Sequence, residues 1–148
     1  MNNIRCNLLI NEIFGFLPHR YPLLLIDRII ILKKFINICV LKNATVNESF
    51  FLGHFKNNPI FPGVLIIEII AQAALMLLFY SFKCHFYKER NFFLAGIKKT
   101  FFKKSVIPGD QMIINVSLIK IVFKNFFFNG SVIVKNNIVC KSEIICSF

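Results

Sequence analysis

The stretch Val64–Phe82 reads VLIIEIIAQAALMLLFYSF, and it decides the fold of this 148-residue chain. It is too long for one strand, and its Leu, Ala, Met, Gln and Glu residues favour a helix. Pro62 suits the first turn of that helix, where the missing backbone N–H costs no hydrogen bond. Because the helix is apolar on nearly every side, other elements must enclose it.

A membrane-spanning helix is the alternative interpretation, since ~20 apolar residues can cross a bilayer. The stretch carries Glu68 and Gln72 one turn apart, however, and an ionised carboxylate is costly at bilayer depth. The segment Met1–Ile10 contains Arg5 and lacks the continuous apolar run of a secretory signal. We therefore expect a core helix without membrane insertion, in a cytoplasmic protein.

Strand-like segments make up most of the remaining sequence. Two precede the helix and four follow it: Leu23–Leu32, Phe35–Ala44, Phe92–Phe102, Met112–Val122, Phe126–Lys135 and Ile138–Cys146. A short helix is expected over Asn11–Phe16. The pattern predicts an α+β fold with one domain over residues 1–148, in which a curved antiparallel sheet wraps around one long buried helix.

Three polar pairs are expected to shape this sheet. Lys33-Lys34 separates the first two strands, and Asn136-Asn137 fits a tight hairpin turn because Asn tolerates positive φ. Asn129-Gly130 would also fit a turn, but a turn there leaves fragments too short to pair well. We therefore expect a bulge within one strand at that pair.

The composition indicates an oligomer without a metal or disulfide framework. Hydrophobic residues make up 56% of the chain and the mean hydropathy is +0.65, which is high for a soluble monomer. A subunit that covers apolar surface with copies of itself explains both values. The five cysteines are odd in number and form no C-x-x-C pair, so neither a zinc site nor a disulfide framework is indicated.

The formal net charge of +11 indicates an acidic partner or a solvated, lysine-rich surface. A cluster of lysines follows the long helix: Lys98, Lys99, Lys103 and Lys104. Nucleic acid would be attracted to such a surface. The chain has no recognised nucleic-acid motif, and its aromatic residues stand in solid runs, so we expect no nucleic-acid partner. An acidic protein is attracted by the same field.

The segment Gly53–Gly63, GHFKNNPIFPG, carries the first candidate for chemistry. It places His54 in a loop that leads into the N-terminus of the long helix. The first amides of a helix lack intrahelical partners and lie at the positive end of its dipole. Gly63 has no side chain that would keep a ligand away from them, so a carbonyl oxygen placed there would be polarised, as in an oxyanion hole.

Glu68 is the second candidate, because a carboxyl group in so apolar a helix needs a partner or loses its charge. A protonated, desolvated Glu is suited to act as a general acid. His54 would take a proton beside a carbonyl, the amide of Gly63 would stabilise the enolate-like charge, and Glu68 would protonate the departing hydroxyl. This chemistry needs no metal or redox cofactor. A structural role remains the alternative, with Glu68 bonded only to Gln72.

Several motifs in order make the chain resemble the FabZ-type 3-hydroxyacyl-acyl-carrier-protein dehydratases, which have the hotdog fold. The resemblance runs from about Leu17 to Cys146. Its motifs are Leu17-Pro18-His19-Arg20-Tyr21-Pro22, Asp27-Arg28, Gly53-His54-Phe55, Asn58-Pro59-Ile60-Phe61-Pro62-Gly63-Val64-Leu65, Glu68, Ala71-Gln72, Phe93-Leu94-Ala95-Gly96-Ile97 and Val106-Ile107-Pro108-Gly109-Asp110-Gln111.

The resemblance implies a hydro-lyase of type II fatty-acid synthesis that makes trans-2-enoyl-acyl-carrier-protein. It implies His54 as general base and Glu68 as general acid, and a substrate-binding set of Gly63, Phe55, Val64 and Gln72. It implies a homodimer in which each site pairs His54 of one subunit with Glu68 of its partner, with three dimers forming a hexamer. Acyl carrier protein is the implied partner, and the lysine cluster is its candidate docking site.

Two segments depart from the family pattern. Lys56-Asn57 replaces the usual Pro-Gly, so we expect Asn57 at positive φ with some strain. Ile97–Phe102 replaces an acid and a base near the substrate entrance, notably at Lys98 and Phe101, which affects acyl preference and carrier docking.

The other two histidines are expected to lie outside the dyad. We expect His19, Arg20 and Asp27 to form a buried polar network before a strand, and His85 to be exposed.

Two rivals stay open. A hotdog thioesterase would hydrolyse the acyl group, but it needs an activated water, whereas this site offers a general acid for a departing hydroxyl. A non-catalytic oligomeric acyl-carrier-binding protein would not need both His54 and Glu68.

Overall fold

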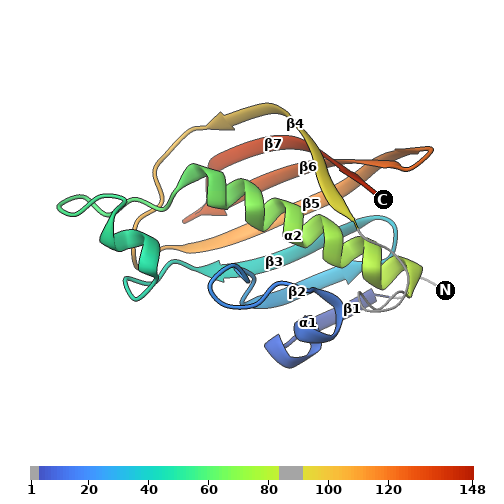
Figure 1. Ribbon diagram of the computed structural model, residues 1–148, viewed down its shortest axis with the longest axis horizontal. Coiled ribbons are helices and arrows are strands. Elements are labelled where there is room, and N and C mark those ends of the chain that lie inside the picture. The colour runs from blue at the N-terminus through green and yellow to red at the C-terminus, as the bar shows by residue number, and fades with distance from the viewer. Residues whose placement is uncertain (1–3, 84–91) are drawn as a thin grey trace.

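A computed structural model describes residues 4–83 and 92–148, and within them a seven-stranded antiparallel sheet curves around one long helix (Figure 1). The strand order is β1-β2-β3-β5-β6-β7-β4. The strands are β1 Ile4–Leu8, β2 Arg28–Lys33, β3 Asn37–Asn43, β4 Phe93–Phe102, β5 Gln111–Val122, β6 Asn125–Val134 and β7 Asn137–Ser147. The helices are α1 Ile10–Phe16, the short 3-10 helix η1 Ser49–Leu52, and α2 Gly63–Phe82.

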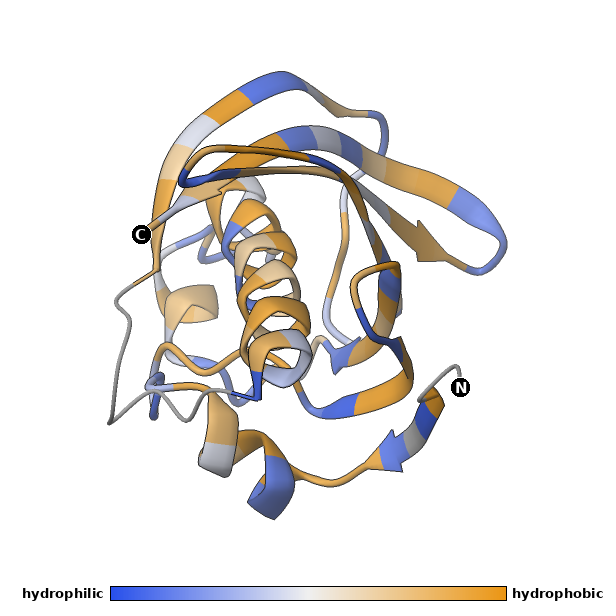
Figure 2. Ribbon diagram, turned by 90° about the vertical axis from the view of Figure 1, so that its right-hand side faces the viewer, coloured by the Kyte–Doolittle hydropathy of each residue, from blue (hydrophilic) through white to orange (hydrophobic). Residues whose placement is uncertain are grey.

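The helix α2 is enclosed as its sequence predicts. It lies inside the curve of the sheet, with apolar residues on nearly all sides (Figure 2). By length and composition it could cross a membrane, but 72% of its apolar window is buried inside the fold, which is consistent with a soluble protein. The buried residues of α2 and of the inner sheet face belong to one core cluster. The helix ends at Lys83, whose left-handed conformation lets its N–H bond the last carbonyls.

Gly130 lies in an uninterrupted strand, and the bulge expected at Asn129-Gly130 is wrong. Its register partner on β5 is Val116 and on β7 is Ser142. The structure explains the glycine differently: a Cβ at position 130 would lie 2.5 Å from the Cγ2 atom of Ile70 on α2. The glycine allows the helix to approach the sheet closely. The register of β5 against β6 shifts instead between Leu118 and Lys120.

Three other boundaries differ from the sequence prediction. Strand β1 was not predicted; it pairs with β2 at the edge of the sheet. Strand β2 begins at Arg28 rather than Leu23, because the backbone of the preceding segment bonds to α2 instead of to the sheet: the N–H of Leu25 donates to Gln72. The β6–β7 turn lies one residue earlier than expected, since Lys135 and Asn136 both have positive φ.

The strand β4 differs from the rest of the sheet in its exposure. Strand β6 alternates between buried and partly exposed residues, as a strand with one covered face should. Every residue of β4 is exposed or only partly buried, on both faces. It is also an edge strand, with only β7 beside it in the described sheet. This edge therefore exposes unpaired backbone groups and apolar side chains to solvent.

Candidate active site

His54 lies in the loop between η1 and α2, at one end of the molecule (Figure 1). Its Nδ1 atom is 2.7 Å from the carbonyl oxygen of Ile60. A carbonyl oxygen only accepts hydrogen bonds, so Nδ1 carries the proton and donates. In the neutral ring with this tautomer, the Nε2 atom keeps its lone pair, which is the state that a general base requires.

Backbone hydrogen bonds hold this loop in a small hairpin. The N–H of Phe55 donates to the carbonyl of Asn58 at 3.2 Å, and the N–H of Asn58 donates back to the carbonyl of Phe55 at 3.0 Å. The N–H of Ile60 donates to the carbonyl of His54 at 2.9 Å. Lys56 and Asn57 form the tip of the turn, and neither has positive φ. The expected strain at Asn57 is therefore wrong, because this turn does not need the conformation that glycine favours.

Gly63 is the first residue of α2, and the ring of Phe102 from the end of β4 packs over it. A Cβ on Gly63 would lie 3.0 Å from that ring, so the glycine makes room for the ring. Phe102 is not among the site residues that the sequence nominated. Phe55 and Val64 are largely exposed, Val64 at 76%, so these two predicted substrate-binding residues form open surface in a single chain.

Gln72 fixes the orientation of Glu68. Its Nε2 atom donates to the Oε1 atom of Glu68 at 2.8 Å and to the carbonyl of Leu23 at 2.7 Å. Its Oε1 atom accepts from the N–H of Leu25 at 3.0 Å. The Gln72 side chain is fully buried, and these three bonds satisfy most of its hydrogen-bonding capacity. The carboxyl group of Glu68, one turn earlier, is thus held on a rigid support.

The carboxyl group opens into a cavity of about 250 Å³ that follows one side of α2. Its helical lining residues stand three or four positions apart, as one face of a helix requires. At one end are His19 and Glu68; the rest is apolar. The full lining is Pro18, His19, Glu68, Ala71, Leu75, Phe79, Phe92, Phe93 and Leu94. His54 is not among these residues, so the second predicted catalytic residue does not line this cavity.

His19 lies beside the carboxyl group of Glu68, and the expected buried network of His19 with Arg20 and Asp27 is wrong. The Nε2 atom of His19 lies 3.5 Å from the Oε1 atom of Glu68. The guanidinium of Arg20 donates to backbone carbonyls, including that of Leu17. Asp27 accepts from the N–H of Asn43 and pairs with buried Lys42. Arg20 and Asp27 are exposed, so the three side chains do not form one buried network. His85 lies outside the described residues.

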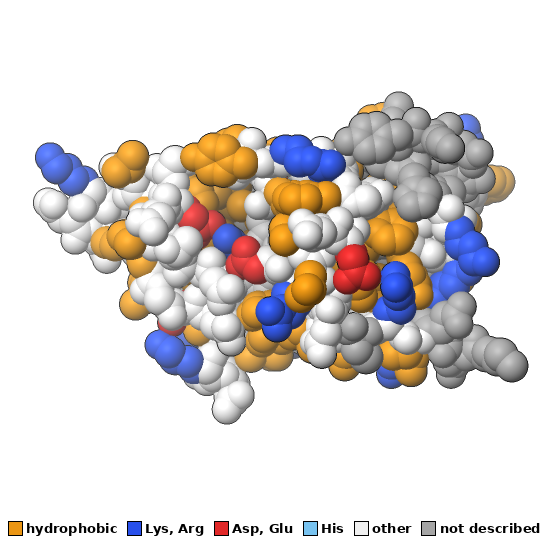
Figure 3. Space-filling model, turned by 90° about the horizontal axis from the view of Figure 1, so that it is seen from below, with side chains coloured by type: hydrophobic (Ala, Val, Ile, Leu, Met, Phe, Trp, Pro, Cys, Tyr) orange, Lys and Arg blue, Asp and Glu red, His pale blue; other side chains and the backbone are white. Residues whose placement is uncertain are grey.

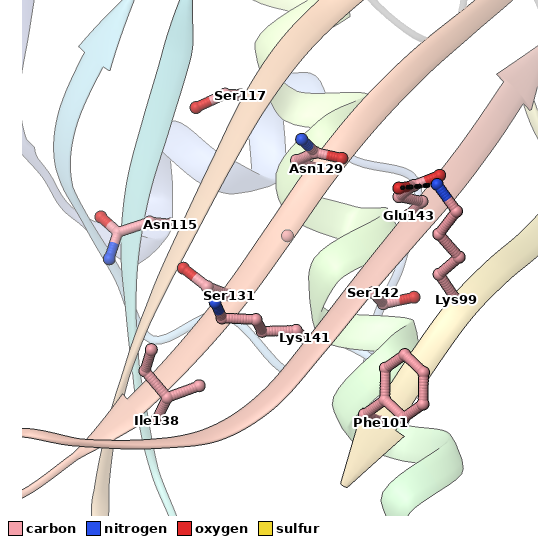
Figure 4. A pocket seen from close by; sticks show the side chains of 11 residues that line it. Lys99, Phe101, Asn115, Ser117, Asn129, Ser131, Ile138, Lys141, Ser142 and Glu143 are labelled. Atoms are coloured by element: carbon pink, nitrogen blue, oxygen red, sulfur yellow. Dashed lines mark ion pairs between the residues drawn. The ribbon is translucent and has the colours of Figure 1, made fainter. Parts of the chain in front are cut away.

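Another hollow, of about 470 Å³, is on the outer face of the sheet, away from α2 (Figure 4). It is lined mainly by Ser, Asn and Lys side chains and contains neither His54 nor Glu68. Its lining is Lys99, Phe101, Asn115, Ser117, Asn129, Gly130, Ser131, Ile138, Lys141, Ser142 and Glu143. These side chains point away from the core because residues of a strand alternate between its faces. The chemistry of this hollow does not match that of the predicted dyad.

The four cluster lysines divide into two pairs. Lys98 and Lys99 belong to β4, and Lys99 pairs with Glu143 at 3.1 Å (Figure 4). Lys103 and Lys104 follow β4, where the Nζ atom of Lys104 donates to the side chain of Asn137 at 3.0 Å. All four are exposed.

Metal ligands do not gather in the part of the chain that the structure describes: residues 4–83 and 92–148 hold no group of three or more His, Cys, Asp or Glu suited to a metal ion. Burial raises the pKa of the Cys140 thiol to about 11. Burial, together with the charge of Glu68, raises the pKa of the Cys146 thiol to about 12. Both are therefore neutral at physiological pH, and they behave as small apolar residues.

The architecture, a curved antiparallel sheet around one helix, is the hotdog fold. A FabA-like domain matches residues 17–147, and the chain belongs to this family. The 3-hydroxyacyl-acyl-carrier-protein dehydratase FabZ of Buchnera aphidicola subsp. Acyrthosiphon pisum is 45% identical over 145 residues, which cover 98% of this chain and 95% of that protein. The resemblance to FabZ-type dehydratases is thereby confirmed, as is the expected enzyme class, a hydro-lyase.

Solved structures confirm the fold. The dehydratase heterocomplex ApeI:P from Xenorhabdus doucetiae matches with a TM-score of 0.76 at 17% identity, over 91% of this chain and 89% of that one. A hypothetical thioesterase from Streptococcus pneumoniae, solved with coenzyme A, matches with a TM-score of 0.60 at 10% identity, over 77% and 79%. These likenesses concern the fold alone, and a fold does not by itself determine function.

Proposed function

We propose that this protein dehydrates 3-hydroxyacyl groups carried on acyl carrier protein to the trans-2-enoyl product, in cytoplasmic type II fatty-acid synthesis. The observation that carries the proposal is the state of the two side chains. His54 is held with Nε2 ready to accept a proton, and Glu68 is held by Gln72 at the polar end of an apolar cavity. The relatives act on this substrate by name.

The reaction follows from these positions. Nε2 of His54 takes the proton on the carbon beside the thioester carbonyl. The amide of Gly63, at the positive end of α2, stabilises the negative charge that develops on the carbonyl oxygen. Glu68 gives a proton to the hydroxyl, which leaves as water. The apolar part of the cavity, from Ala71 to Phe79 along α2, suits the acyl chain.

The active unit in this proposal is a homodimer whose sites are shared, with three dimers forming a hexamer. His54 does not line the cavity that contains Glu68. Strand β4 is an edge strand exposed on both faces, and Leu52 and Phe101 are 85% and 63% exposed. Hydrophobic side chains also reach the surface between charged ones on the face seen in Figure 3. A second copy of the chain would cover such apolar surface and bring in the missing histidine.

Lys98, Lys99, Lys103 and Lys104 are the proposed docking site for the acidic carrier protein. All four side chains are exposed. Only Lys99 has an acidic partner on the described part of the chain, so most of this positive charge is available to a partner.

One assay separates the candidate functions. The protein is incubated with a 3-hydroxyacyl carrier thioester, and the products are analysed for enoyl thioester, free acid, or neither. Enoyl product supports the dehydratase, free acid supports a thioesterase, and neither supports a binding protein. Replacing His54 with Ala or Glu68 with Gln should lower turnover by about 100-fold or more, the usual scale for a positioned acid or base. Near-normal dehydration by either variant would refute the role of that residue.

A further inference from the structure

His19 shares the cavity of Glu68 and approaches the same oxygen that Gln72 holds. The Nε2 atom of His19 is 3.5 Å from Oε1 of Glu68, and Nε2 of Gln72 is 2.8 Å from that atom. Neither contact involves Oε2 of Glu68. The two nitrogens therefore lie on one side of the carboxyl group, and its second oxygen is left for a substrate.

Two anchors in the backbone hold His19 there. Leu17, two residues before it, is the C-cap of α1 and is fully buried in the core. The following segment is tied to α2 where Gln72 bonds the backbone of Leu23 and Leu25. His19 lies between these two anchors, and its side chain is only 17% exposed. Its position beside Glu68 is thus fixed from both sides.

The surroundings of His19 select one neutral tautomer. Its Nδ1 atom is buried and has no hydrogen-bond partner among the described residues. A proton on Nδ1 would be a buried donor without an acceptor, which is costly. A proton on Nε2 instead points toward an acceptor, Oε1 of Glu68. The geometry therefore favours the Nε2–H form.

The charges around His19 favour the neutral form. Burial lowers the pKa of His19 below its usual value; the charge of Glu68 on α2 opposes this, and Arg20 on the same segment adds to it. Cys146 on β7 also interacts with the charge of Glu68. Burial and that charge raise the pKa of the Cys146 thiol, so the thiol is neutral and adds no charge near His19.

We propose that His19 is a positioning residue for Glu68, donating from Nε2 to Oε1 so that Oε2 presents its proton to the leaving hydroxyl. The inference rests on the proposed function, in which Glu68 is the general acid. The separation of 3.5 Å is longer than a strong hydrogen bond, and such contacts often shorten when substrate binds. After proton transfer, the same two donors would stabilise the carboxylate that remains.

A double-mutant cycle tests whether His19 acts through Glu68. Replacing His19 with Leu should lower kcat about 10-fold, the scale of one hydrogen bond to a charged group, with little change in KM. In a Glu68→Gln background, His19→Leu should cost nothing further. Independent, multiplying effects or a rise in KM alone would overturn the proposal, since they indicate that His19 only shapes the cavity. If Glu68→Gln by itself keeps near-normal activity, the proposed function fails first.

Two polar variants provide a matched comparison that does not depend on the Leu variant folding. In His19→Gln an amide nitrogen reaches the position of Nε2, whereas in His19→Asn it reaches only that of Nδ1. We expect His19→Gln to keep most of the activity and His19→Asn to lose about as much as His19→Leu. Equal activity of the two variants would contradict the assigned donor. Nitrogen NMR of the wild-type protein should show His19 as the Nε2–H tautomer, and an Nδ1–H tautomer would overturn the proposal.

Discussion

The two halves of the proposed site are built in opposite ways. Glu68 stands on a buried helix, with Gln72 behind it bonded to the backbone of Leu23 and Leu25. His54 stands in a surface loop whose neighbours, such as Leu52 and Phe55, are exposed. The contacts that hold Glu68 all come from its own chain, whereas the surface around His54 exposes apolar side chains to solvent. In the proposed shared-site dimer, assembly would therefore depend on the packing of apolar surface as well as on chemistry.

Mixing two inactive proteins tests this comparison with the largest expected effect. A His54→Ala chain and a Glu68→Gln chain should each be nearly inactive. If each site takes His54 from one chain and Glu68 from the other, a mixed dimer has one site with both changes and one with neither. Random exchange should then restore about a quarter of wild-type activity, because half of the dimers are mixed and half of their sites are intact. No recovery, with exchange verified by mass spectrometry, would place both residues of a site on one chain.

Replacing Gln72 with Leu should damage the rigid half. The change removes the donor to Glu68 and leaves the N–H of Leu25 without its acceptor. We expect kcat to fall about 10-fold or more and the free energy of unfolding to fall by about 1–3 kcal/mol. Ser81→Ala is the matched control: Ser81 is also buried on α2, and it accepts from the N–H of Phe35 at 2.9 Å, far along the helix from Glu68. The control should lose stability with little loss of kcat; equal losses of kcat would mean that Gln72 has no specific role.

Replacing Gly130 with Ala should destabilise the fold without changing the chemistry. Its Cβ would lie 2.5 Å from Cγ2 of Ile70, and overpacking of a core typically costs about 1–3 kcal/mol. Urea denaturation measures this loss. Adding Ile70→Ala should remove the clash, so the double variant should lose less than the sum of the single ones. Gly15→Ala is the control, because a Cβ at Gly15 on α1 meets nothing within 4 Å; a similar loss there would point to backbone conformation rather than contact with α2.

Lower pH should weaken the fold through His19. Its pKa in the folded protein is lowered, mainly by burial, below the value of about 6.5 for an unfolded chain. As the pH falls below that value, the unfolded chain binds the proton first, so the free energy of unfolding decreases until the folded pKa is reached. The stability difference between about pH 7.5 and about pH 5.5 should therefore be smaller in His19→Gln than in the wild type. An unchanged difference would show that His19 titrates alike in both states.

Salt should have the smallest effect, and it acts on the outer surface rather than on either half of the site. If the lysine cluster attracts the carrier, apparent affinity for carrier-bound substrate should weaken as the Debye length falls from ~30 Å at 0.01 M to ~10 Å at 0.1 M. The maximal rate should change little, because steering acts on association. Changing Lys98, Lys99, Lys103 and Lys104 to Gln should flatten this response. Small thioesters without the carrier are the control, and equal salt sensitivity for them would place docking elsewhere.

The sequence by itself determined the buried helix, the strands around it and the candidate dyad. An apolar run of this length must be buried, and its single carboxyl group then needs a polar partner. The order of the motifs along the chain predicted the family. Local patterns placed the β6–β7 turn within one residue and kept Asn129-Gly130 inside a strand. They misjudged Asn57, because the absence of glycine in a loop does not reveal the φ that the loop needs.

Only the tertiary structure decided which side chains meet. Gly130 is explained by Ile70, and Gly63 by Phe102, through approaches of elements far apart in the chain. His19 and Glu68 are 49 positions apart in sequence, yet Nε2 of His19 lies near Oε1 of Glu68. The two residues meet because Gln72 ties the segment before β2 to α2. Such contacts depend on how helix and sheet pack, and packing sums many weak interactions over the whole fold. Residue patterns along the chain report only local preference, so they could nominate His54 and Glu68 but not His19.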